Sequence, residues 1–167
     1  MRTVARVGDH GRKESDLATG THDKFIVRKP LYEDLPNEAP GEGVNTGVTE
    51  TETFMSAAQV AGSPLHITWG IIHAVPPKNP YVVEHDHPYD EVLFFQGFDP
   101  ENTLDLGAVF ELSMDGEVQV IDSTCGIFIP AGTKHCPLTV KSVTRPCGLA
   151  AICVSGRYQT MGYATPV

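Results

Sequence analysis

The sequence lacks several features that would assign its class directly. Its first twenty residues carry charges throughout and contain no apolar stretch typical of an export signal. Residues 53–77 have no Asp, Glu, Lys or Arg, but they include histidines and prolines that are unfavourable in lipid, so we expect no membrane span. The four cysteines form no Cys-x-x-Cys pair, and we interpret them as reduced thiols of a cytoplasmic protein.

Basic residues are scarce and unevenly placed in this chain of 167 residues. Twelve Lys and Arg stand against 21 Asp and Glu, a formal charge of −9, which argues against nucleic acid or an anionic membrane as a partner. Residues 1–29 hold seven bases and four acids, whereas residues 30–167 hold five bases and 17 acids. The basic arm has no helix-turn-helix pattern, and it is either a solvated tail or a segment that docks on an acidic surface.

Short apolar runs separated by turn residues dominate the rest of the sequence. Gly (16) and Pro (13) are plentiful, and Asp115-Gly116 is a hairpin signal. This pattern predicts an all-β sandwich or antiparallel barrel. The expected strands are residues 65–75, 81–87, 91–96, 106–113, 117–122, 127–129, 136–143 and 149–154. We divide the chain into an N-terminal arm and acidic loop, 1–52, with one short strand at 24–29, and a barrel domain, 53–167.

The strongest chemical signal is a set of three histidines and one glutamate. His85 and His87 are two residues apart and therefore share one face of a strand, and a turn at Pro88 can return Glu91 to that face. His135 follows a Pro-x-Gly turn on a distant strand. Three imidazoles and a carboxylate suit Fe, Mn, Ni, Cu or Zn, and four protein ligands leave coordination positions open.

These residues resemble the two sequence motifs of the cupin superfamily. His85, His87, Glu91 and Gly97 follow the first motif, with Gly97 one residue early and Asn79 in place of the leading glycine. The second motif is followed by Pro130, Gly132 and His135, whereas Thr124 and Thr139 replace its first Gly and last Asn. The resemblance covers about residues 65–154. It implies a cupin-like double-stranded β-helix (jelly-roll) barrel that binds one divalent transition metal (Fe, Mn, Ni or Zn) through His85, His87, Glu91 and His135.

Other residues are candidates for roles near the metal. His73 shares strand parity with Trp69, and if that face lines the barrel His73 is a candidate acid/base residue; a buried structural histidine is the alternative. Trp69, Tyr89 and Phe95 are candidate substrate-binding residues, with core packing or turn formation as the alternative. His66 has the opposite parity and is expected to face solvent or a neighbouring subunit. We interpret Cys136 as a core residue.

Three functions fit these observations. The first is a metal-dependent enzyme acting on a small organic molecule, and a dioxygenase is favoured because many cupin oxygenases use three His and one Glu. The second is a redox-neutral decarboxylase, lyase or isomerase using the metal as a Lewis acid. The third is a non-catalytic small-molecule binder. The resemblance also implies a homodimer, which would cover exposed strand edges.

Overall fold

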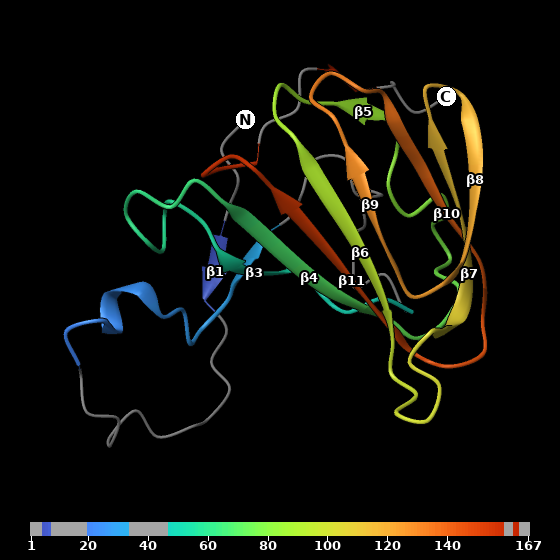
Figure 1. Ribbon diagram of the computed structural model, residues 1–167, viewed down its shortest axis with the longest axis horizontal. Helices are drawn as coiled ribbons and strands as arrows, with labels where there is room; N and C mark the ends of the chain where they lie inside the picture. The colour runs from blue at the N-terminus through green and yellow to red at the C-terminus, as the bar shows by residue number, and fades with distance from the viewer. Residues whose placement is uncertain (1–4, 8–19, 34–46, 159–161, 164–167) are drawn as a thin grey trace.

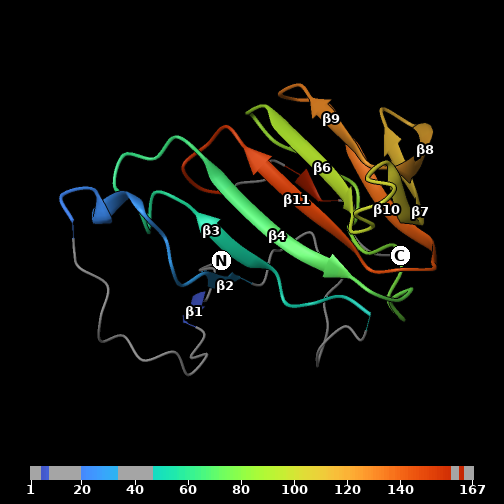
Figure 2. The same ribbon diagram turned by 60° about the horizontal axis from the view of Figure 1, so that its bottom comes forward.

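The computed structural model describes residues 5–7, 20–33, 47–158 and 162–163, and these residues form two antiparallel sheets. Figures 1 and 2 show the sheets facing each other, with β6 and β9 of one sheet near β5 and β10 of the other. The seven-stranded sheet contains, in order, β1 (Ala5–Val7), β2 (Leu31–Glu33), β3 (Glu52–Met55), β4 (His66–Ile72), β11 (Cys147–Cys153), β6 (Glu91–Gly97) and β9 (Cys125–Ile129). The five-stranded sheet contains β12 (Gly162–Tyr163), β5 (His85–Asp86), β10 (His135–Val143), β7 (Asp105–Met114) and β8 (Glu117–Ser123). The predicted all-β jelly-roll fold is confirmed.

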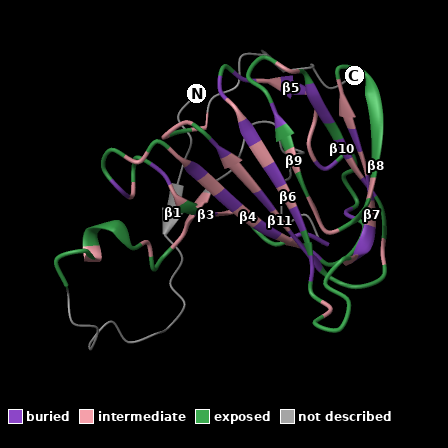
Figure 3. Ribbon diagram, in the orientation of Figure 1, coloured by how far each residue is buried: buried purple, intermediate pink, exposed green. Residues whose placement is uncertain are grey.

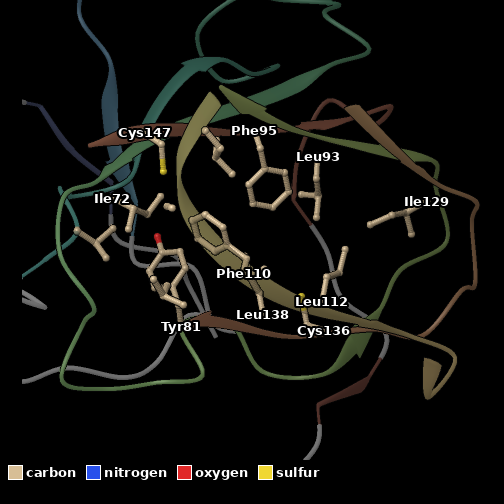
Figure 4. Packing of buried hydrophobic residues seen from close by; sticks show 14 residues of the cluster. Ile72, Tyr81, Leu93, Phe95, Phe110, Leu112, Ile129, Cys136, Leu138 and Cys147 are labelled. Atoms are coloured by element: carbon tan, nitrogen blue, oxygen red, sulfur yellow. The ribbon is translucent and has the colours of Figure 1, made fainter. Parts of the chain in front are cut away.

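The core lies between the inner faces of the two sheets. Burial alternates along β4 and β6 and over residues 136–140 of β10, as expected for strands with one face toward a core (Figure 3). Phe95 of β6 and Phe110 of β7 meet with ring centroids 5.1 Å apart, and both side chains are fully buried (Figure 4). Leu112 and Leu138 continue this layer toward Ile129. Aromatic and aliphatic packing across the layer therefore joins the sheets.

The hairpin between β7 and β8 follows the local sequence. Asp115 and Gly116 have φ angles of 48° and 84°, the left-handed pair that a two-residue hairpin loop of this kind requires. The ladder runs from Met114 paired with Glu117 to Asp105 paired with Ser123. The hairpin signal in the sequence is confirmed.

The strand expected at residues 81–87 is shorter than predicted. Only His85 and Asp86 form a strand, and Val82 makes an isolated bridge to Leu138. The partner strand β10 changes register between His135 and Leu138. Cys136 has a φ of 64° there, and the next residue is a proline without an amide proton, so the ladder is interrupted.

The N-terminal strand prediction also needs correction. Residues 24–29 form no strand: Asp23–Phe25 is a short 3-10 turn (η1), and the strand lies at Leu31–Glu33 instead. Leu31 pairs with Thr53 at the edge of β3, and Ala5 pairs with Glu33. A strand needs a partner, and residues 31–33 are the ones that align with this edge. The predicted arm therefore contributes two strands to the larger sheet, while most of its acidic loop lies outside the described residues.

Two further expectations concern the cysteines and the membrane. All four cysteines are free thiols, as the sequence predicts. Within the described ranges no helix is long and apolar enough to cross a bilayer. The cytoplasmic location inferred from the thiols stays a prediction.

Candidate metal centre

The two sheets bring the four predicted ligands together at one end of the barrel. His85 lies on β5, His87 follows it in the turn, and Glu91 begins β6 of the opposite sheet. His135 begins β10 and pairs directly with His85. All four are buried, and their ligating atoms lie within 4.8 Å of one another. The structure thus gathers the predicted donor set from both sheets.

Each histidine is oriented by a backbone carbonyl. Nδ1 of His85 lies 2.9 Å from the Val83 oxygen, and Nδ1 of His135 lies 2.9 Å from the Thr133 oxygen. Nδ1 of His87 lies 2.6 Å from the oxygen of Tyr89. A carbonyl oxygen only accepts, so Nδ1 carries the proton in each neutral ring and Nε2 keeps its lone pair. This is the tautomer in which Nε2 can bind a metal.

The Nε2 atoms converge on the carboxylate of Glu91. Its Oε2 atom lies 3.1 Å from Nε2 of His87 and 3.2 Å from Nε2 of His135. Nε2 of His135 is buried yet has no hydrogen-bond partner within the described structure. Lone pairs and a negative charge that converge in a buried site require a proton or a cation between them. The residues therefore fit a divalent transition metal, and nitrogen with oxygen donors suits Fe, Mn, Ni or Zn.

Electrostatics favours the ligating protonation states of His85 and Glu91. Burial, aided by the charge of His135, lowers the pKa of His85 to about 4. Burial alone would raise the pKa of Glu91, but the neighbouring imidazoles of His135 and His87 outweigh it and lower the pKa to about 2. Burial would lower the pKa of His135, but Glu91 and the Thr133 carbonyl raise it overall. Near neutral pH the site presents a neutral His85 beside an ionised Glu91.

Two residues that the sequence analysis missed contact this donor set. The hydroxyl of Tyr158 lies 3.0 Å from Nε2 of His85 and donates to it, because Nδ1 of that ring carries the proton. The thiol of Cys153 donates to Oε1 of Glu91 over 3.5 Å, leaving Oε2 toward the histidines. Burial raises the pKa of both Tyr158 and Cys153, so they remain neutral donors. Tyr158 follows the last long strand and belongs to no motif, so no sequence pattern pointed to it.

The turns that carry the ligands are tied to each other. The amide of Ala131 donates to Oδ1 of Asp90 at 2.9 Å, and the amide of Gly132 donates to the oxygen of His87 at 2.8 Å. Gly132 has a φ of 79°, which explains the glycine of the Pro-x-Gly turn. These bonds hold the two ligand-bearing segments in one register.

Two departures from the cupin motifs have local explanations. Asn79, which replaces a glycine, donates from Nδ2 to the Val140 oxygen at 2.7 Å and accepts from the Val140 amide at 3.0 Å. Its side chain thus pairs with the backbone of β10. Thr124, which replaces the other glycine, accepts a hydrogen bond from the Gly97 amide at 2.9 Å. Both replacements thus form hydrogen bonds with barrel strands, Asn79 with β10 and Thr124 with β6.

The prediction of which face of β4 lines the barrel is wrong. His66 is only 2% exposed and its ring lies 6.0 Å from that of Tyr158, whereas His73 lies beyond the strand and is exposed. The inner face carries His66, Thr68 and Ile72, and the indole of Trp69 lies over Gly148 on the outer face. Both faces of this strand carry apolar residues, so alternation alone could not identify the inner one. His73 is therefore not near the metal centre.

The other candidates are mostly packed against their neighbours. Tyr89 stacks on the ring of His87 at 4.3 Å with an interplanar angle of 6°. Phe95 points inward as predicted, but it packs on Phe110 in the core and does not border the cavity. Cys136 is a core residue as predicted, yet the irregularity in β10 also turns it toward the cavity beside His135.

A cavity of about 60 Å³ adjoins the four-residue site. His85, Glu91, His135 and Tyr158 border one end of it, and Leu93 and Leu149 belong to its walls. Trp69 is next to the cavity because it lies in β4, but its indole lies on the outer face of the sheet. A volume of this size holds a few water molecules or a small organic ligand.

Fold and site together define a cupin barrel with a candidate metal centre. No family model and no curated protein matches the sequence. Among solved structures, the chain is similar to a cupin 2 domain-containing protein from Halorhodospira halophila, with a TM-score of 0.50, 12% identity and 81% of each chain covered. It is also similar to a cupin-2 domain protein from Rhodospirillum rubrum (TM-score 0.48, 10% identity, 77% of this chain and 73% of that chain). A third similar structure is the polyketide cyclase RemF from Streptomyces resistomycificus (TM-score 0.42, 14% identity, 75% and 78%). The first of these supports the cupin fold, and at such identities the likeness carries no activity over to this chain.

Proposed function

We propose that this protein is a metal-dependent cupin enzyme acting on a small organic molecule. His85, His87, Glu91 and His135 would hold the metal. The observation that carries the proposal is the convergence of three Nε2 atoms and one carboxylate within 4.8 Å, buried and next to a cavity. A divalent metal there supplies Lewis-acid or redox chemistry toward an oxygen-bearing substrate.

The chain's own residues support catalysis as well as binding. The Tyr158 hydroxyl and the Cys153 thiol reach the same group of ligands and can hold a proton beside a reacting group. Apolar residues in the cavity wall, among them Leu93, Leu138 and Leu149, would replace water around a bound substrate. Of the candidate reactions we favour a dioxygenase, because the three-His, one-Glu set resembles that of many cupin oxygenases. A redox-neutral lyase, decarboxylase or isomerase is the alternative.

Protein purified without chelators or added metal is expected to contain close to one transition-metal ion per chain, measured by inductively coupled plasma mass spectrometry. Iron or manganese is expected with the dioxygenase, and oxygen consumption with catechols and β-diketones then tests it. If the protein contains zinc or nickel and its turnover is unchanged without oxygen, the redox-neutral reaction is favoured. A chain that takes up no metal even after reconstitution would contradict the proposal.

We also propose that the protein is a homodimer in which a second copy covers the outer face of the seven-stranded sheet. That face exposes Phe128 by 58% and Phe98 by 47%, and Phe98 lies 6.4 Å from the ring of Trp69. Exposed aromatic groups of this kind are typical of interaction surfaces. Light scattering is expected to give a dimer for the native chain and a monomer for Phe128→Asp. A monomeric native chain at micromolar concentration would rule the dimer out.

A further inference from the structure

We infer that the cavity takes a small monoanion whose single charged group lies at the four-residue site and whose remainder is uncharged and apolar. The inference rests on the proposed metal site and names the substrate class for it. It depends on three features of the cavity: its charge, its walls and its size.

The described residues that line the cavity include no basic side chain. Glu91 is the only carboxylate among its lining residues, and none of them is Lys or Arg. Every Lys and Arg whose burial the structure describes is exposed, and several are already paired, as Lys141 is with Glu111 and Arg145 with Asp105. A buried charge without a partner is unfavourable. Any charge on the substrate must therefore be balanced at the four-residue site itself.

The charge of that site matches one anionic group. A divalent cation beside the ionised Glu91 and three neutral imidazoles leaves one net positive charge. One carboxylate, enolate or phenolate neutralises it, whereas a second carboxylate or a phosphate ester would leave an uncompensated negative charge. The Tyr158 hydroxyl, 3.0 Å from Nε2 of His85, is a neutral donor at the same end of the cavity. Once a metal occupies the Nε2 lone pair of His85, this hydroxyl would be free to orient the anionic group by a hydrogen bond.

The rest of the cavity is apolar and short. Its walls include Ile72, Leu93, Leu138 and Leu149, and Thr51 and Thr68 supply uncharged hydroxyl groups. Gly70 stands on the inner face of β4 between Thr68 and Ile72, and a Cβ atom there would have only the Thr49 Oγ1 atom within 4 Å, at 3.9 Å. The missing side chain of Gly70 thus leaves space that a short hydrocarbon group can fill.

The test compares ligands of nearly equal length on the Co(II)-loaded protein. Butyrate, succinate and butyramide present one charge, two charges and none, and binding is read from the visible absorption of bound Co(II). Butyrate is expected to bind at least tenfold more tightly than either of the others. Equal or tighter binding of succinate or butyramide would overturn the inference. A chain that takes up no Co(II) would overturn the proposed metal site and this inference with it.

The Gly70→Leu variant tests the role of the cavity independently of the metal site. The variant is expected to keep Co(II) uptake and to bind formate as the native protein does, while its affinity for butyrate falls at least tenfold. Ala151→Leu fills the same cavity from β11 and serves if Gly70→Leu does not fold. Unchanged butyrate affinity in a folded variant of either kind would show that the ligand does not occupy this cavity.

Discussion

The His135→Ala variant is expected to bind divalent metal roughly a hundredfold or more weakly than the native protein. The change removes one of four buried donors, the one whose Nε2 atom has no hydrogen-bond partner in the described structure. The barrel should still form, because His135 only begins β10 and the inward residues Leu138 and Val140 keep their packing. Metal content after dialysis and isothermal titration calorimetry measure the loss.

The matched control is His73→Ala, which removes an exposed histidine at the end of β4. It should retain the native metal content and affinity. Thermal unfolding of the metal-free native protein and of both variants is followed by circular dichroism. All three proteins are expected to unfold cooperatively, which would show that weaker metal binding comes from the missing ligand and not from loss of the fold. Full metal occupancy in His135→Ala, or an equal loss in His73→Ala, would show that the donor set is not the binding site.

Gly97→Ala is expected to lower the free energy of unfolding by about 3 kcal/mol or more, or to prevent folding. A Cβ atom at Gly97 would lie 1.9 Å from the backbone oxygen of Asp105 and 3.0 Å from the Cα atom of Leu106. These are backbone atoms where β6 approaches the start of β7, so no side-chain rotation can make room. Urea denaturation followed by circular dichroism measures the change.

Gly126→Ala is the control, because it lies on the neighbouring strand β9 and its Cβ atom would meet only Phe94 at 3.9 Å. That is an ordinary contact, so the free energy of unfolding should change by less than about 1 kcal/mol. If Gly97→Ala were as stable as Gly126→Ala, the close approach of β6 and β7 would not exist in solution.

Most strands after residue 65 could be predicted from the sequence because they depend on local patterns. The Asp115-Gly116 turn and the apolar runs beside it correspond to a hairpin with the expected ends. The ligands could be predicted because their spacing already limits where the side chains point: His85 and His87 are separated by one residue, and His135 follows a Pro-x-Gly turn. Local conformational preferences were sufficient for both.

His66 shows where local reasoning failed, and Cys136 shows a strand irregularity that simple alternation does not predict. In a regular strand Cys136 would point away from its neighbour His135, but its φ of 64° and the register change in β10 turn both side chains inward. His66 was assigned to solvent because the large residues Ile67 and Trp69 alternate with it. The inner face instead borders a cavity, where small and polar residues fit, and the outer face is apolar as well.

The sequence by itself determined the all-β class, most of the strands after residue 65 and the four candidate ligands, because each of these follows from spacing and turn chemistry within short segments. Only the tertiary structure decided which face of β4 is inside and that Tyr158 and Cys153 reach the ligands. These contacts join residues up to 73 positions apart. They depend on how the two sheets pack, and no local pattern encodes that.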